Sequence, residues 1–130
     1  MEKKKYYKYL FLVSALWNWI IGIIFFLIPL VWPAGFGFFG VAVPPSNIFI
    51  HAFFGLVFIF GIGYFIIFLD INKNHGILII GAVAKGFVFV NFLVYLILGE
   101  FNFIGFIPVI IDLIFACLFV EFLIGIKKIE

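Results

Sequence analysis

Four long apolar segments constrain the fold of this chain more than any other feature. They cover about residues 9–31, 48–69, 76–98 and 104–126. Each is close to the ~20 residues that an α-helix needs to cross a hydrocarbon core of ~30 Å. A helix satisfies its own backbone hydrogen bonds in lipid, and these segments lack the alternating polarity of membrane β-barrel strands. The sequence therefore predicts an all-α, integral membrane, up-down bundle of four transmembrane helices in one domain, residues 1–130.

The composition supports lipid as the surrounding solvent. The chain is 68% hydrophobic and 11% charged, against about 45–50% and about 25% in ordinary soluble domains. Phenylalanine alone occurs 22 times in 130 residues. A soluble chain of this length has too much surface to hide so much apolar side chain. The formal net charge of +2 is too small to indicate a nucleic-acid partner.

Two connecting stretches are less clearly defined. The apolar, proline-containing residues 32–47 are predicted to form a loop that lies on the membrane surface. Pro108 suits the first turn of a helix, so the fourth helix has an alternative start near Ile107. In that case the preceding "FNFIGF" would be an interfacial loop.

The lysines predict the orientation of the helices. With four spans, all lysines outside the apolar segments fall on one side of the membrane: Lys3, Lys4, Lys5, Lys8, Lys73, Lys127 and Lys128. The loops on the other side contain no lysine or arginine. The positive-inside rule then places both termini in the cytoplasm. The expected location is the inner (cytoplasmic) membrane. Tyr6, Tyr7, Tyr9 and Trp32 occupy positions typical of an interfacial aromatic belt.

Polar side chains inside the spans are the candidate functional residues, because an ionisable group costs at least ~2.5–3.5 kcal/mol at the centre of a membrane helix. The ionisable candidates are Lys85, Asp112, Glu121 and His51, and the uncharged ones are Asn18, Asn91 and Tyr64.

Lys85 is near the middle of the third span. On the fourth span, Glu121 is expected on the cytoplasmic side of its level and Asp112 on the outer side, at similar separations. The Cα–Cβ bond tilts toward a helix's N-terminus, which directs Lys85 and Glu121 toward each other and Asp112 away. We therefore predict a Lys85–Glu121 pair with Tyr64 nearby. Asp112 would join His51 and Asn91 in a second cluster. Such a pair is either a clamp between helices or a functional site.

Small and polar residues also repeat at helical spacing in the first span. Ser14, Asn18 and Gly22 follow one another every four residues. This pattern favours a helix-packing seam.

Several kinds of site are excluded or unsupported. A single cysteine, Cys117, excludes an internal disulfide and paired-cysteine redox chemistry. His51 and His75 are expected at opposite ends of the bundle, so they cannot bind one haem iron. No acidic cluster has metal-ligand spacing, and "GFGFFG" lacks the strand and helix that flank a phosphate loop. We therefore assign no catalytic residue, metal or cofactor, and consider an enzyme less favoured.

Three stretches, "GIGYFIIFLD", "NHGILIIGAVAKG" and "DLIFACLFVEFL", resemble the small DoxX-like bacterial membrane proteins. The resemblance covers about half of the chain. It implies four helices and, by analogy with some relatives, a membrane subunit of a quinone-linked complex. The matching positions are Gly63, Tyr64, Asp70, Lys85 and Asp112. The resemblance thus points to Asp112, whereas side-chain direction favours Glu121.

The leading functional prediction is a non-catalytic accessory subunit, or a component associated with a lipid or quinone. Its partners would be the bilayer and either another membrane protein or a second copy of the chain. The first alternative is a small transporter or proton-coupled carrier that uses Lys85 and the carboxylates. The second alternative is a membrane enzyme that acts on a lipid or quinone.

Overall fold

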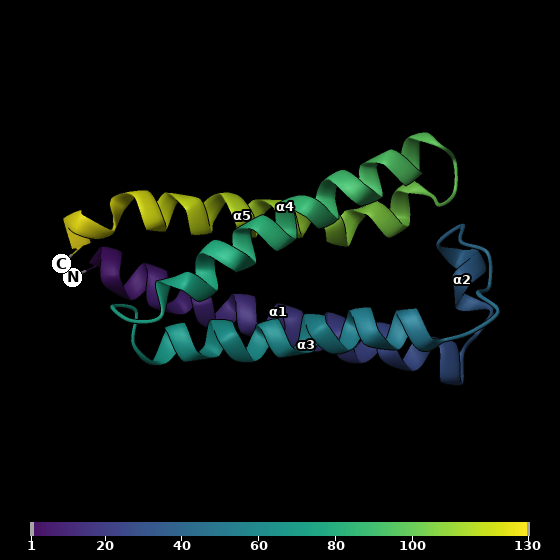
Figure 1. Cartoon of the computed structure of the whole chain (residues 1–130), viewed down its shortest axis with the longest axis horizontal. Coiled ribbons are helices and arrows are strands. Elements are labelled where there is room, and N and C mark those ends of the chain that lie inside the picture. Colours follow the sequence, from purple (N-terminus) through teal and green to yellow (C-terminus); the bar gives the residue numbers. More distant parts are fainter. Residues whose placement is uncertain (1, 130) are drawn as a thin grey trace.

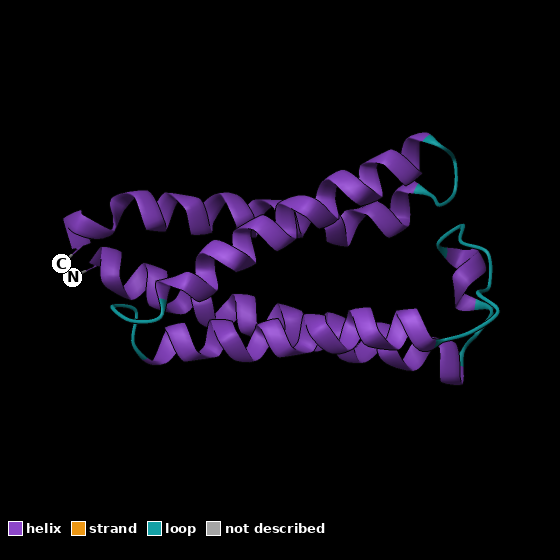
Figure 2. Ribbon diagram, in the orientation of Figure 1, coloured by secondary structure: helices purple, strands orange, loops and turns teal. Residues whose placement is uncertain are grey.

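A computed structural model describes residues 2–129, in which every regular element is a helix (Figure 2). The elements are α1 (Glu2–Val31), α2 (Gly35–Phe38), α3 (Ile48–Leu69), α4 (His75–Ile97) and α5 (Phe103–Ile129). All except the short α2 are long and apolar enough to cross a membrane. The prediction of an all-helical fold with four helices that could span a membrane is confirmed.

The observed helix limits differ from the predicted ones mainly at the termini. The second span matches α3 at both ends, and α4 and α5 each begin one residue earlier than predicted. α1 begins at Glu2 because the lysine and tyrosine residues before the apolar segment continue the helix. The alternative start near Ile107 is wrong, since Pro108 lies inside α5. The predicted loop after α1 contains α2.

The four long helices form two pairs, α1 with α3 and α4 with α5 (Figure 1). Both termini and the α3–α4 turn lie at one end of the molecule, which we call the terminal end. α2 and the α4–α5 turn lie at the opposite end, which we call the α2 end. The pairs approach each other near the terminal end and spread apart toward the α2 end (Figure 1).

The α1–α3 pair uses the predicted seam. Ser14, Asn18 and Gly22 are all buried. A Cβ atom on Gly22 would lie 3.1 Å from the backbone oxygen of Phe54 and 3.3 Å from Cβ of Phe58, both on α3. The absence of a side chain at Gly22 therefore lets the two backbones approach closely, and the seam prediction is confirmed.

Two groups of buried apolar side chains fill the bundle unequally. The larger, which we call the terminal core, contains Tyr7, Leu10, Phe11, Ala15, Tyr64, Ile67, Ile71, Leu78, Phe115, Phe119 and Phe122. The smaller contains Phe101, Phe106 and Val109 near the α4–α5 turn. The terminal core includes residues of all four long helices, whereas the smaller cluster packs within the α4–α5 hairpin. The two helix pairs are thus joined by side chains mainly in the terminal half.

At the α2 end, Asn102 links the connection after α1 to the α4–α5 hairpin. Its backbone N–H donates to the Phe39 oxygen at 2.9 Å, and its Nδ2 donates to the Phe38 oxygen at 2.9 Å. Its Oδ1 accepts from the N–H of Gly105 at 3.1 Å, in the first turn of α5. Gly40 has φ +72°, and a Cβ there would lie 3.0 Å from the Asn102 nitrogen. This region requires glycine for both its backbone angle and its close approach.

Candidate functional site

The central ion pair joins α4 to α5. Nζ of Lys85 lies 2.7 Å from Oδ1 of Asp112. The Lys85 side chain is 7% exposed and that of Asp112 is 22% exposed. The predicted Lys85–Glu121 pair is therefore wrong. The partner of Lys85 is Asp112, the carboxylate to which the resemblance to the DoxX-like proteins points.

The register of the α4–α5 hairpin explains this correction. At ~1.5 Å per residue, Lys85 lies about 18 Å before the end of α4, and Asp112 and Glu121 lie about 14 Å and about 27 Å after the start of α5. Measured from the shared turn, Asp112 is therefore about 4 Å from the level of Lys85 and Glu121 about 9 Å from it. The long lysine side chain spans the smaller offset. Counting from the turn would have identified the partner, because α5 extends beyond α4 at the other end.

Asn18 connects the ion pair to the α1–α3 pair. Its Oδ1 accepts a hydrogen bond from Nζ of Lys85 at 3.1 Å. Its Nδ2 donates to the backbone oxygen of Val57 on α3 at 3.0 Å. Asn18 therefore belongs both to the packing seam and to the polar site. The sequence pattern listed it among the polar candidates but favoured the seam.

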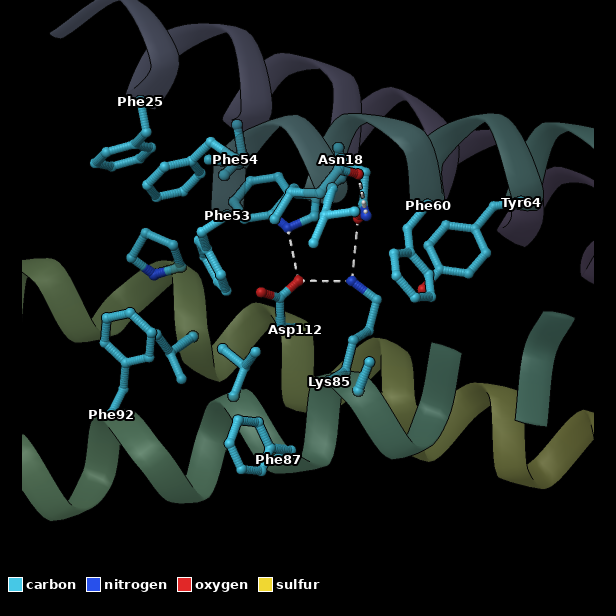
Figure 3. A pocket seen from close by; sticks show the side chains of 18 of the residues that line it. Asn18, Phe25, Phe53, Phe54, Phe60, Tyr64, Lys85, Phe87, Phe92 and Asp112 are labelled. Carbon is cyan, nitrogen blue, oxygen red and sulfur yellow. Dashed lines mark hydrogen bonds and ion pairs between the residues drawn. The ribbon is translucent and has the colours of Figure 1, made fainter. Parts of the chain in front are cut away.

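Trp17 completes the site and was missed by sequence analysis. Its Nε1 donates to Oδ1 of Asp112 at 3.1 Å. The available signal was its position: tryptophans favour membrane interfaces, and an indole N–H buried mid-span needs an acceptor. With Trp17 included, hydrogen bonds run from α3 through α1 to α4 and α5, so one polar chain contacts all four long helices (Figure 3).

Two aromatic rings lie beside the lysine ammonium. The ring centroids of Tyr64 and Phe115 are 5.5 Å and 5.6 Å from Nζ of Lys85. Both distances allow a cation–π attraction. Tyr64 reaches this position because Gly81 on α4 has no side chain: a Cβ there would lie 2.6 Å from the Tyr64 hydroxyl oxygen. Tyr64 therefore lies beside the Lys85–Asp112 pair, whereas the sequence predicted it beside a pair of Lys85 with Glu121.

A pocket of about 280 Å³ opens beside the ion pair, between the two helix pairs. Its polar lining comes from Trp17, Asn18, Tyr64, Lys85 and Asp112, and its other walls are mostly aromatic or aliphatic. The aromatic walls include Phe25, Phe53, Phe54, Phe60, Phe87 and Phe92 (Figure 3).

The pocket is asymmetric along the bundle. Its lining extends from Tyr64 and Lys85 to Gly105 near the start of α5, in the half of the molecule where the pairs spread apart. The terminal core fills the other half. Leu56 on α3 and Phe87 on α4 line the pocket and are 55% and 69% exposed. The exposed part of the pocket wall therefore lies on α3 and α4, on the side of the bundle.

Glu121 belongs to a separate polar contact. Its Oε1 accepts from the Tyr7 hydroxyl at 2.8 Å. Tyr7 is 3% exposed, so it is buried in the terminal core rather than part of an aromatic belt. Glu121 itself is exposed, and it does not line the pocket.

The predicted cluster of Asp112, His51 and Asn91 does not form. His51 Nε2 lies 3.1 Å from the Phe26 backbone oxygen, and the two rings stack with centroids 4.0 Å apart. Asn91 is exposed on α4 and does not line the pocket. Helix direction alone could not reveal these positions, because they depend on rotation of each helix about its own axis.

Within the part of the chain that the structure describes, no three histidine, cysteine, aspartate or glutamate side chains gather as metal ligands would. The site is a neutral ion pair with hydrogen-bonding neighbours beside an apolar pocket. It can bind a polar group while apolar walls hold the remainder of a ligand.

Comparisons with protein-family models, with curated proteins and with solved structures found no match to this chain. The resemblance to the DoxX-like proteins therefore stays a prediction.

Proposed function

We propose that this membrane protein is a non-catalytic binding component that holds a small lipid-soluble molecule in the pocket between its helix pairs. The observation that carries this proposal is the pocket itself: apolar walls that lead to the polar group of Trp17, Asn18, Lys85 and Asp112. Small-molecule sites have this composition, with mostly apolar walls and a few placed polar groups. The ring head of a quinone in its oxidised or reduced form, or of a lipid of similar size, is the class expected.

The size of the pocket limits the part of the ligand that it encloses. Its volume of about 280 Å³ is just below the ~300–1,000 Å³ of typical ligand pockets. A single substituted ring fits such a space, and a complete two-chain lipid does not. An attached alkyl chain would leave between α3 and α4, where Leu56 and Phe87 are exposed.

The packing favours binding over passage through the bundle. The terminal core closes the half of the molecule between Lys85 and the terminal end, where Phe11, Phe119 and Phe122 are fully buried. A carrier would have to open this core during each cycle. No histidine contacts the ion pair among the described side chains, since His51 and His75 bond to backbone oxygens elsewhere. We assign chemistry on the bound molecule to a partner membrane protein, with this chain as its accessory subunit.

In the proposed orientation, the protein lies in the inner membrane and both of its termini face the cytoplasm. It is supported by the lysines of the first turns of α1 and by Lys73, which lies in the α3–α4 turn at the same end. The α4–α5 turn at the other end contains Glu100 and no lysine. This asymmetry agrees with the positive-inside rule.

Ligand binding tests the proposal directly. The purified protein in lipid nanodiscs would be dialysed against decyl-benzoquinone and, separately, decyl-hydroquinone, with empty nanodiscs subtracted for partitioning. We expect saturable binding of at least one form. Ala84→Phe should abolish that binding, because Ala84 lines the pocket and the larger ring would fill it.

Val83→Phe is the matched control. Val83 adjoins Ala84 on α4, but it is 68% exposed and does not line the pocket. This variant should bind as the unchanged protein does. Binding of neither form, or equal binding by both variants, would contradict a ligand site in this pocket.

A further inference from the structure

One carboxylate oxygen of Asp112, a residue that lines the pocket, accepts no hydrogen bond from the described residues. Both hydrogen bonds that Asp112 accepts, from Lys85 and Trp17, end on Oδ1. Among the described residues, no hydrogen bond reaches Oδ2. Figure 3 shows this second oxygen directed away from Lys85, toward the space between Phe53 and Phe92. The Asp112 side chain is 22% exposed, and Asp112 lines the pocket.

A carboxylate oxygen only accepts hydrogen bonds. Oδ2 is not among the buried polar atoms without a partner in the described residues, so a ligand can reach it. A ligand that covers this oxygen without donating to it would leave it unpaired in an apolar site, at a large desolvation cost. We infer that the pocket selects an uncharged ligand whose ring head carries a hydrogen-bond donor, such as a phenol, hydroquinone or other hydroxyl, that donates to Oδ2 of Asp112. This inference rests on the proposed binding function and specifies the ligand class.

The charges at the site explain why the donor should be uncharged. Lys85 already neutralises Asp112 at 2.7 Å. A cationic ligand would add a second positive charge in an apolar pocket, and an anion would be repelled by Oδ2. A neutral hydroxyl satisfies the oxygen without changing the net charge.

The lysine offers little to a competing acceptor ligand. Two of its three N–H groups donate to Asp112 and Asn18. The rings of Tyr64 and Phe115 lie beside the ammonium at 5.5 Å and 5.6 Å. A molecule that only accepts hydrogen bonds, such as a quinone or an ether, can accept from the third Lys85 N–H or from the Tyr64 hydroxyl, which also line the pocket, but it leaves Oδ2 of Asp112 unpaired.

A matched ligand pair tests the inference. Para-nonylphenol and its methyl ether have nearly the same shape, but only the phenol can donate. Dissociation constants would be measured by equilibrium dialysis in nanodiscs, with empty nanodiscs subtracted. Because hydrogen bonds to charged groups are stronger than neutral ones, we expect the phenol to bind about tenfold more tightly or better.

The variant Asp112→Asn provides a second measurement. Its amide oxygen can keep the Lys85 and Trp17 bonds, which turns the NH₂ group into the pocket as a donor. The phenol should then lose its advantage, and the ratio of the two dissociation constants should fall to about one. Glu121→Gln, which lies outside the pocket, should keep the ratio of the unchanged protein.

The outcomes separate this inference from the function on which it rests. If phenol and ether bind the unchanged protein equally, a binding function remains and the donor selectivity is overturned. If neither they nor the decyl compounds bind saturably, the proposed function is overturned as well. The thermal transition of Asp112→Asn shows whether this variant is folded. If it is folded and the ratio of the two dissociation constants is unchanged, Oδ2 does not accept the ligand's hydrogen bond.

Discussion

Lys85 Nζ and Asp112 Oδ1 lie 2.7 Å apart, although the two residues are 27 positions apart in the chain. Their bond crosses from α4 to α5, and Asn18 and Trp17 extend it to α1. A buried ion pair between two apolar helices fixes the register of one against the other, because either charge alone would be costly to bury.

The first prediction concerns the identity of this pair. Lys85→Met should lower the free energy of unfolding by about 3–5 kcal/mol, because the Asp112 carboxylate would lose its counter-charge. Adding Asp112→Asn should restore most of the loss. Thermal or denaturant unfolding in detergent measures both effects, and the double-mutant cycle gives their coupling.

Glu121→Gln is the control for that cycle. Glu121 bonds to Tyr7 and not to the lysine, so its effect should add to that of Lys85→Met without coupling. A Lys85→Met variant as stable as the unchanged protein, or one rescued by Glu121→Gln, would contradict the pairing seen here.

The second prediction concerns the contact of α3 with α4 at Gly81. Gly81→Ala should reduce the melting temperature, because the new Cβ would lie 2.6 Å from the Tyr64 hydroxyl oxygen and 2.8 Å from its ring. Tyr64→Phe in the same chain should relieve part of the loss, since it removes the nearest atom. A cost of ~1–3 kcal/mol is typical of such overpacking.

Gly86→Ala offers a matched comparison on the same helix. Nothing lies within 4 Å of a Cβ at Gly86, and alanine has the higher helix propensity, by up to ~1 kcal/mol. This variant should be as stable as the unchanged protein or slightly more so. Equal losses for the two alanine substitutions would argue against the tight contact at Tyr64.

The third prediction concerns the link at the α2 end. Asn102→Ala removes the side-chain bonds to the Phe38 oxygen and the Gly105 N–H. The amides of residues 102 and 105 should exchange hydrogen faster, while amides of the terminal core keep their protection. Hydrogen exchange followed by mass spectrometry measures this, with Asn91→Ala, exposed on α4, as the comparison. Faster exchange throughout the chain would mean that the link supports the whole fold.

The fourth prediction concerns orientation. In a Cys117→Ser background, Lys73→Cys should react with a membrane-impermeant maleimide only after the cytoplasmic side is made accessible. Ser46→Cys, on the connection that leads to α3, should react from outside in intact cells. The reverse pattern would contradict the positive-inside assignment.

Local physics explains why the sequence predicted the helices so well. The limits of α3 matched at both ends because its apolar residues run from Ile48 to Leu69 between polar residues. The Ser14–Asn18–Gly22 seam was also predictable, because small residues at helical spacing mark close packing in lipid. The early start of α1 was missed because its lysines remain good helix formers outside the apolar segment.

Composition and periodicity act locally, so the amino-acid sequence alone predicted the helices, the four that could span a membrane and the rare polar residues within them. The pairing of Lys85 with Asp112, the contact of Trp17 with that pair and the pocket beside them appear only in the folded bundle. Those relations depend on the rotation and relative level of helices that are distant in the chain. In an almost uniformly apolar sequence, many rotations place similar side chains against each other, so only the packed bundle distinguishes among them.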